Sequence, residues 1–201
     1  MALLQDLSEH LQIDDPEERQ IISSVSWEQY EAVLTDLGEN PAYHVTFLDG
    51  TLEIMSPSRR HEISAENIGR LLEAYLEETR TRFWGLGSTT FRRAETRGGT
   101  EPDKSYNLGT EKDVPDLAIE VIVTSGGVDK LEIYKRLGVT EVWFFQENCF
   151  TVYHLQGEAY ERLAASALLP DLDLAMLADH AMRPDPLEAL MAYRRRVRGD
   201  G

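Results

Sequence analysis

The sequence predicts a mixed α/β (α+β) protein, because segments with helical periodicity alternate with short strand-like runs along its 201 residues. Two observations support this class: a long amphipathic helix near the middle of the chain, and a series of short apolar runs separated by turn signals. From Glu62 to Phe145 the expected order is α-β-β-β-α-β. A helix and a hairpin are expected before this core, and a hairpin and a helix after it.

The first 24 residues are interpreted as an amphipathic arm. Four leucines recur at helical spacing, and Pro16 then interrupts the pattern. A capping box that begins at Ser26 opens the next helix, which is expected to run to Leu37 and to end at Gly38. The leucines of the arm are Leu3, Leu4, Leu7 and Leu11.

The pair Asp49-Gly50 is the strongest short-range hairpin signal in the chain, and it joins predicted strands at 43–48 and 51–55. The most regular helix follows, from about Glu62 to Arg80, because apolar side chains recur there at i, i+3, i+4, i+7 and i+8. These side chains are Ile68, Leu71, Leu72, Tyr75 and Leu76.

Shorter patterns predict the remaining elements. A helix from about Val128 to Leu137, closed by Gly138, is expected to precede a strand that ends at Phe145. A turn around Gln156-Gly157 is expected to join the two strands of the C-terminal hairpin. The expected ranges are strands at 88–92, 104–108, 117–123, 141–145, 149–155 and 159–163, and a last helix at 186–196.

The length suits one well-packed domain with additions at both ends. We therefore divide the chain into an N-terminal arm (1–24), a main domain (25–170) and a C-terminal extension (171–201) that ends in a helix. No signal peptide and no membrane span are expected, because acidic residues are scattered through the N-terminus and no long apolar run is present.

The net charge of −16 argues against a protein that coats nucleic acid non-specifically, since that activity depends on clustered Lys and Arg. The stretch from Arg59 to Arg97 is an exception, because basic residues slightly outnumber acidic ones there. The single cysteine, Cys149, excludes an internal disulfide and a thiolate zinc cage, which fits the reducing cytoplasm.

Two carboxylates carry most of the functional information. Glu120 lies inside an apolar strand pattern, where an uncompensated charge would cost several kcal/mol, so a cation is expected beside it. Asp103 follows Pro102 and enters a neighbouring strand. Two carboxylates that converge across strands suit Mg²⁺ or Mn²⁺ and indicate phosphodiester chemistry. Two other interpretations remain open: a turn or capping role for Asp103 and a structural ion pair for Glu120.

The order of elements and several motifs resemble the PD-(D/E)xK nucleases, and more narrowly the Uma2 family of restriction-endonuclease-like proteins. The resemblance covers roughly Val25 to Leu169. It implies a DNA endonuclease that uses Mg²⁺ or Mn²⁺, with Asp103 and Glu120 as the metal-binding pair. The motifs are Leu48-Asp49-Gly50-Thr51-Leu52-Glu53-Ile54-Met55-Ser56-Pro57, His61-Glu62, Glu101-Pro102-Asp103, Pro115-Asp116-Leu117-Ala118-Ile119-Glu120-Val121, and Tyr134 with Gly138-Val139-Thr140-Glu141-Val142-Trp143.

The lysine of the general motif is displaced, because Ile122 stands two residues after Glu120. Lys130 is the expected substitute, since it falls in the first turn of the next helix and has a long flexible stem. The resemblance supports this choice, because related sequences often place a lysine four residues before the tyrosine that matches Tyr134. A solvated Lys130 paired with Asp129 or Glu132 is the competing interpretation.

Glu62 is the third candidate metal ligand, because it lies at the edge of the apolar stripe of its helix. A helix-dipole role near the N-terminus is the alternative. His61 is a candidate for proton transfer or phosphate orientation, and its alternative is a half-buried structural histidine.

Three functions remain open from the sequence. The first is an Mg²⁺-dependent DNA endonuclease. The second is a catalytically silent nuclease-like fold that binds nucleic acid or a protein partner, and the third is a metal-dependent hydrolase with another substrate. A homodimer is expected for a nuclease of this size, with the leucine-rich arm and the Asp49-Gly50 hairpin as candidate contacts.

Overall fold

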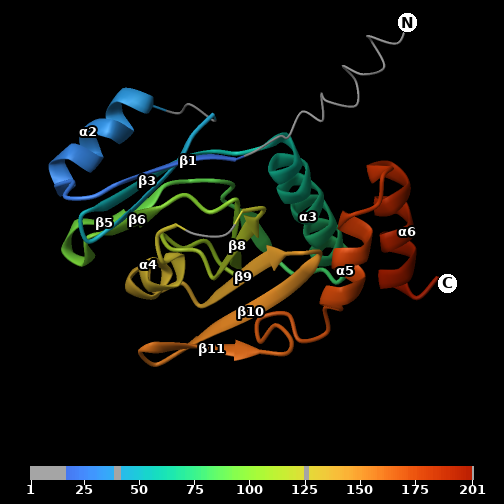
Figure 1. The fold of residues 1–201 in the computed structure, drawn as a ribbon. Coiled ribbons are helices and arrows are strands. Elements are labelled where there is room, and N and C mark those ends of the chain that lie inside the picture. The colour runs from blue at the N-terminus through green and yellow to red at the C-terminus, as the bar shows by residue number, and fades with distance from the viewer. Residues whose placement is uncertain (1–16, 39–41, 125–126, 201) are drawn as a thin grey trace, which may run out of the picture.

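The computed structural model describes residues 17–38, 42–124 and 127–200, and the strands in these ranges form two sheets (Figure 1). Residues 1–16 of the predicted arm, which include its four leucines, lie outside these ranges. The five-stranded sheet contains, in spatial order, β1 (Glu18–Ile22), β3 (Thr51–Ser56), β2 (His44–Leu48), β6 (Gly98–Thr100) and β5 (Phe91–Arg93). A short 3₁₀ turn, Ala94–Thr96, connects β5 to β6.

The six-stranded sheet contains, in spatial order, β11 (Ala159–Leu163), β10 (Cys149–Gln156), β9 (Glu141–Gln146), β8 (Leu117–Ile122), β7 (Lys104–Leu108) and β4 (Phe83–Gly85). Its neighbours are antiparallel except for β8 and β9, which are parallel and are connected through helix α4 (Lys130–Leu137). A parallel pair requires such a crossover connection.

Helix α2 (Trp27–Leu37) covers one face of the five-stranded sheet (Figure 1). The predicted capping box at Ser26 is confirmed, with both reciprocal bonds between Ser26 and Gln29 present. Tyr30 is fully buried and stacks on Phe47 of β2, with ring centroids 4.9 Å apart. This aromatic contact fixes the helix on its sheet.

Helix α3 (Arg59–Glu78) packs its predicted apolar stripe against β8, whose Leu117, Ile119 and Val121 face the same core. Helices α5 (Leu174–Ala181) and α6 (Pro186–Arg198) lie beside α3 and belong to the same packed layer (Figure 1). Ion pairs from Arg194 and Arg198 to Glu78 tie α6 to the end of α3.

Helix α4 packs against both sheets. Its Ile133, Tyr134 and Leu137 share a buried cluster with Ala118 of β8 and with Phe91 of β5. The side chains of β8 therefore divide between two surroundings: alternate residues face α3 on one side and α4 on the other. Glu120 lies on the side of α4, together with Ala118.

The predicted fold class is confirmed, and the α-β-β-β-α-β order holds for the six-stranded sheet with α3 and α4, although the first strand is a different segment and β5 and β6 enter the other sheet. This first strand is β4, which pairs with β7. The predicted strand Ser88–Arg92 is wrong in its bounds and its place, because only its end forms β5, in the other sheet. Thr89 instead donates to the carbonyl of Leu86 and forms a turn there.

Other differences concern short elements. Helix α3 begins at Arg59 because Ser58 caps it, accepting a hydrogen bond from the amide of His61. Strands β1, β4 and β6 and helix α5 were not expected. Strand β1 pairs with β3, although its residues fall within the range interpreted as an arm.

No helix in the described part of the chain is long and apolar enough to span a membrane. The Asp49-Gly50 turn, a candidate dimer contact, is engaged within its own chain. Asp49 accepts two hydrogen bonds from Arg136, and the carbonyl of Gly50 accepts one from the amide of Val25.

Candidate active site

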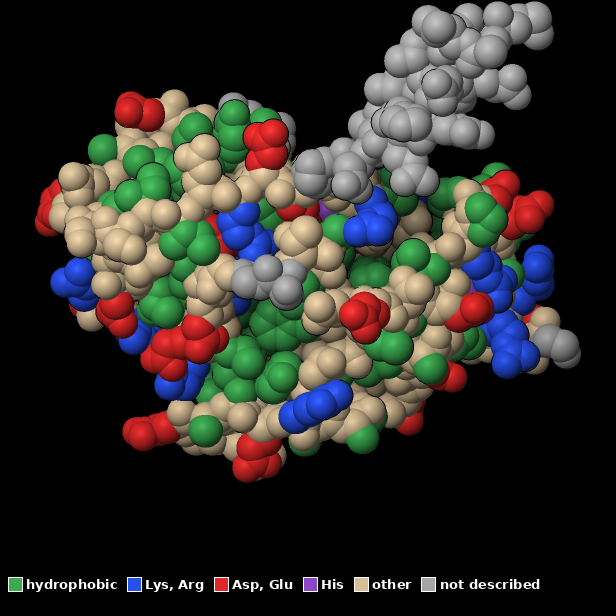
Figure 2. All heavy atoms as spheres, in the orientation of Figure 1, with side chains coloured by type: hydrophobic (Ala, Val, Ile, Leu, Met, Phe, Trp, Pro, Cys, Tyr) green, Lys and Arg blue, Asp and Glu red, His purple; other side chains and the backbone are tan. Residues whose placement is uncertain are grey.

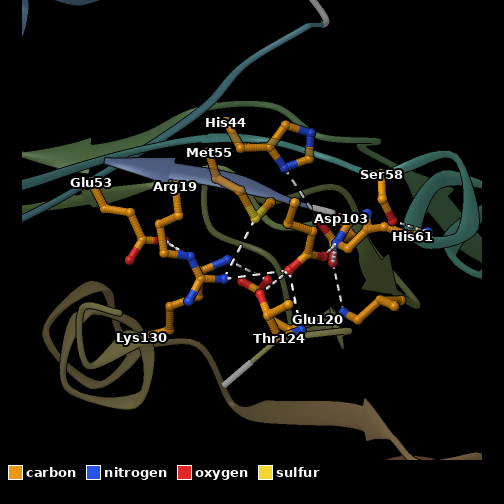
Figure 3. Close-up of polar contacts among 12 residues, drawn as sticks. Arg19, His44, Glu53, Met55, Ser58, His61, Asp103, Glu120, Thr124 and Lys130 are labelled. Carbon is orange, nitrogen blue, oxygen red and sulfur yellow. Dashed lines mark hydrogen bonds and ion pairs between the residues drawn. The ribbon is translucent and has the colours of Figure 1, made fainter. Parts of the chain in front are cut away.

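The two predicted carboxylates come together at the boundary between the two sheets (Figure 3). Strands β7 and β8 are antiparallel with Lys104 opposite Ile119, so Asp103, one residue before β7, falls opposite Glu120. Both are almost completely buried, with 6% and 1% of their surfaces exposed. The amide of Val121 donates to Asp103 Oδ2 at 2.6 Å and fixes that carboxylate beside β8.

Lys130 and Tyr134 of α4 reach Glu120 from the first and second turns of that helix. Lys130 Nζ lies 2.5 Å from Glu120 Oε2, and the hydroxyl of Tyr134 donates to Oε1. Both oxygens of Glu120 are thus paired. Their position follows from the sequence, since Asp129 caps α4 and so sets its start next to the end of β8.

Two histidines flank Asp103 on the side of the five-stranded sheet and α3 (Figure 3). His61 Nε2 lies 3.2 Å from Asp103 Oδ2, and His44 Nδ1 of β2 lies 3.3 Å from Oδ1. The second contact lacks hydrogen-bond geometry, because Asp103 Oδ1 and His44 Nδ1 are both buried with no hydrogen-bond partner among the described residues. Oδ1 of Asp103 therefore has the ion-pair contact with His44 but accepts no hydrogen bond from the described residues.

The charges in this cluster oppose the cost of burial. Burial alone raises the pKa of Asp103, but the contacts with His44 and His61 and the charge of Lys130 hold it well below its usual range. Burial raises the pKa of Glu120 above its ordinary value. Burial lowers the pKa of Lys130, but the charges of Glu120 and Asp103 outweigh this and raise it overall. Asp103 and Lys130 are therefore both charged at neutral pH, and Glu120 is the more easily protonated acid.

His61 is a cation in this setting. Burial lowers its pKa, but the contacts with Asp103 and Glu62 and the charge of Glu17 together raise it to about 10. Glu62 is more remote: its side chain is 57% exposed, and its Oε1 lies 3.6 Å from His61 Nδ1. Glu62 thus contacts His61, which in turn contacts Asp103.

The five-stranded sheet also fixes the segment between β8 and α4. Glu17 Oε2 accepts hydrogen bonds from the amide and the hydroxyl of Thr124, at 3.2 and 2.5 Å. Glu53 Oε2 of β3 accepts one from the amide of Val128 at 3.0 Å. These two acids hold both ends of the connection that leads from Glu120 to Lys130. Arg19 of β1 lies between them, 3.7 Å from Glu17 and 3.6 Å from Glu53.

A cavity of about 310 Å³ opens in front of Glu120 and Lys130. Residues from both sheets and from α4 line it, and Ile122 is among them, on the same side of β8 as Glu120. Other lining residues are Arg19, Glu53, Phe144 and Gln146. The carboxylate of Glu120 is thus buried but lies at a cavity that a ligand can enter.

The donor set fits Mg²⁺ or Mn²⁺ as the family resemblance implies. No three His, Cys, Asp or Glu side chains within the described ranges could together hold a metal ion. Mg²⁺ does not need three, because it commonly binds one or two carboxylates and keeps waters or substrate phosphates as its other ligands. Asp103 and Glu120 would supply the protein's share, with the free Oδ1 of Asp103 as the clearest vacant donor.

Glu141 shows what a structural buried acid looks like in the same fold. It is fully buried at the start of β9, and its oxygens accept hydrogen bonds from Trp143 Nε1, Ser166 Oγ and the amide of Ala167. His154 Nδ1 also lies 3.3 Å from Oε2, so both oxygens of Glu141 have partners. Asp103 instead leaves Oδ1 without a hydrogen-bond partner among the described residues, a pattern typical of a functional site.

The structure thus brings Asp103, Glu120, Lys130 and His61 together and leaves Glu62 at the edge. Sequence reasoning did not identify the other polar residues near the site. His44 lies in a hairpin strand without a distinctive motif. Arg19 lies within residues 1–24, the range interpreted as the N-terminal arm. The missed residues are Glu17, Arg19 and His44, and the sequence named Glu53 and Tyr134 only as parts of motifs, without a role in the site.

A family model matches residues 27–180 and describes its family, Uma2, as "putative restriction endonuclease". A comparison with curated proteins finds no match. The matched range contains Asp103, Glu120, Lys130 and both histidines, and it begins after Glu17 and Arg19. Because it spans most of the described chain, we conclude that the protein belongs to the Uma2 family.

Proposed function

We propose that the protein is a metal-dependent endonuclease that hydrolyses DNA phosphodiester bonds, with Asp103 and Glu120 holding Mg²⁺ or Mn²⁺. The observation that carries the proposal is the pairing of two buried carboxylates on adjacent strands, beside a cavity and next to a buried lysine. Family membership supports a nuclease. The exposed, free Cys149 is compatible with the cytoplasmic location that we include in the proposal.

In this proposal each residue has a distinct task. A divalent ion would neutralise the phosphate and lower the pKa of the attacking water. Asp103 stays ionised and holds its position through Val121 and His61, so it presents Oδ1 in a fixed direction. The ammonium of Lys130 stabilises the negative charge that grows on the phosphate in the transition state. His61 acts as a positioning residue for Asp103.

Glu62 has a weaker case as a ligand, because its carboxylate is largely exposed and contacts His61. We retain it only as an outer group that orients His61. Its removal should then alter activity less than removal of either buried carboxylate.

Cleavage of supercoiled plasmid tests the proposal, with Mg²⁺ or Mn²⁺ supplied and with EDTA as the blank. Asp103→Asn and Glu120→Gln should abolish cleavage and Mn²⁺ binding by calorimetry. Asp113→Asn is the matched control, since Asp113 is an exposed acid between β7 and β8. Equal cleavage by wild type and Asp103→Asn would show that the activity is contamination and would refute the proposal.

A catalytically silent nucleic-acid-binding protein is the second candidate. Ile122 replaces the motif lysine, and both oxygens of Glu120 are already paired with Lys130 and Tyr134. DNA binding by a protein that neither takes up Mn²⁺ nor cleaves plasmid would favour this candidate over the nuclease.

A further inference from the structure

Arg19 of β1 is a partly buried cation at the cavity, and few hydrogen bonds engage its guanidinium among the described residues. Its side chain is 19% exposed and forms part of the cavity wall, which also contains Glu120 and Lys130 (Figure 3). Its Nε has no hydrogen-bond partner in the described ranges. The one hydrogen bond found there for its guanidinium is weak, from Nη2 to Met55 Sδ at 3.6 Å.

The nearby carboxylates balance the charge of Arg19 without satisfying its donors. Glu17 and Glu53 lie 3.7 and 3.6 Å away, beyond ordinary hydrogen-bond distance. Both acids also serve backbone groups, since Glu17 binds Thr124 and Glu53 binds Val128. A guanidinium carries five N–H donors in a planar fork. Arg19 is therefore held in place electrostatically, while among the described residues its Nε has no acceptor and its Nη2 has only a thioether.

An anionic substrate needs a cation with unused hydrogen-bond donors in this cavity, because acidic side chains surround it. Four acids lie at the cavity or at the boundary between the two sheets next to it: Glu17, Glu53, Asp103 and Glu120. In the space-filling view, basic side chains lie among acidic ones in the hollow between the five-stranded sheet and α4 (Figure 2). Lys130 is already paired with Glu120. Arg19 is the cavity-lining cation that retains unused donors.

We propose that Arg19 binds a phosphate of the DNA strand that enters this cavity, through a bidentate contact from its guanidinium to two non-bridging oxygens. The inference rests on the proposed function and names the residue that holds its substrate. Planar guanidinium and phosphate match geometrically, whereas an ammonium offers only a point charge. Family membership does not assign this role, because Arg19 precedes the residues that match the family model.

A purely structural role for Arg19, as the counter-charge of Glu17 and Glu53, makes a different prediction. Arg19→Lys keeps the positive charge between the two acids and loses the fork, so a structural role would leave DNA binding unchanged. Arg19→Gln removes the charge as well. The matched control is Arg162→Gln, because Arg162 is an exposed arginine on β11, at the far edge of the six-stranded sheet.

Binding of a short fluorescein-labelled DNA duplex, followed by anisotropy with EDTA present so that the probe is not consumed, tests the inference. Arg19→Gln should weaken binding on the order of tenfold and lower the slope of log K against log salt concentration by about 1. Arg19→Lys should retain the slope and weaken binding roughly threefold or more. Arg162→Gln should bind like wild type.

Thermal melting of each variant accompanies the binding measurement. If Arg19→Gln does not fold, the comparison rests on Arg19→Lys. Wild-type affinity in a folded Arg19→Lys would overturn the inference, and so would a wild-type protein that does not bind the duplex. Plasmid cleavage by wild type tests the proposed function separately, so a failure of the inference can be distinguished from a failure of the proposed function.

Discussion

Removal of the Lys130 side-chain charge should destabilise the fold by an amount that depends on pH. In Lys130→Met, the carboxylate of Glu120 remains buried beside Asp103 and retains only the hydroxyl of Tyr134 as a partner. A buried charge that loses its partner is strongly destabilising. Methionine keeps the length and the apolar stem of lysine, so the change isolates the ammonium.

The size of the effect has an upper limit. Glu120 can take up a proton instead of remaining charged, so the cost at pH 7 cannot exceed that of raising its pKa to 7 from the ordinary 4.5. This limit is about 3.4 kcal/mol at pH 7 and about 1.4 kcal/mol at pH 5.5. When the pKa of Glu120 is raised in the folded state, the variant keeps its full stability below the unfolded pKa of 4.5. It loses stability as the pH rises above that value. The penalty should therefore grow from pH 5.5 to pH 7.

Urea denaturation in EDTA measures the penalty as a change in the free energy of unfolding. Adding Glu120→Gln to Lys130→Met should recover most of the loss, because no buried charge is then left unpaired. The control is Lys135→Met on the same helix, where a partly exposed pair with Glu132 is lost and the change should stay below about 1 kcal/mol. A penalty that does not change with pH, or a double variant less stable than Lys130→Met, would refute the reasoning.

The same lysine should control turnover. Lys130→Ala should lower the rate of DNA cleavage by on the order of 10²-fold, the effect of one preorganised electrostatic group, while Mn²⁺ still binds. Ile122→Lys added to it should restore part of the rate, because the side chain at 122 lies on the cavity side of β8. Wild-type turnover in Lys130→Ala would refute this role of Lys130 and would indicate that another residue supplies the charge.

Three further predictions concern packing, pH and assembly. Gly99→Ala should cost about 1–3 kcal/mol in urea denaturation, since its Cβ would clash with the hydroxyl of buried Tyr30; unchanged stability would contradict this packing. Hydrogen bonds from Arg198 and Arg194 lower the pKa of Glu78 to about 2, so their stabilisation is present above the ordinary 4.5 and is lost toward pH 2. The melting temperatures of wild type and Glu78→Gln should therefore converge as pH falls across that window, and parallel curves would count against it. Light scattering should give twice the 22.8 kDa of the chain if the protein is a homodimer, and a monomeric mass would remove that idea.

Local signals predicted the elements whose cause is local. The capping box at Ser26, the turn at Asp49-Gly50 and the left-handed cap at Gly138 all lie where the sequence places them. The strands β7 and β11 match their predicted ranges fully, because each has a bounded apolar or aromatic pattern. These features depend on residues within a few positions of one another.

The missed elements depend on tertiary contacts. Strand β6 is Gly98-Gly99-Thr100, which has no alternation and becomes a strand only between β2 and β5. Strand β4 has three residues, too few for a periodic pattern. Helix α5 follows a turn and is nearly apolar, so it lacks the contrast that reveals an amphipathic helix.

The same distinction between local patterns and tertiary contacts explains which residues of the site were predictable. Glu120 was predictable, because a carboxylate within an apolar run is unusual by itself. Asp103 was predictable from its place after Pro102, at the entry to the neighbouring strand. The proximity of Lys130 followed from the expected helix start. His44 and Arg19 arrive from another sheet, so their proximity depends on how the two sheets pack, which no local pattern specifies.

The seam between the sheets has a consequence for the timing of activity. Segments 17–61 supply the histidines and the acids that fix the 124–128 connection, while 103–130 supply the carboxylates and the lysine. Neither half contains the whole constellation. During synthesis, about seventy further residues must be added after residue 61 before the chain reaches residue 130 and all the partner groups exist. A nuclease built in this way would be inert as a nascent or partly unfolded chain and could cut DNA only after both sheets have closed on α4.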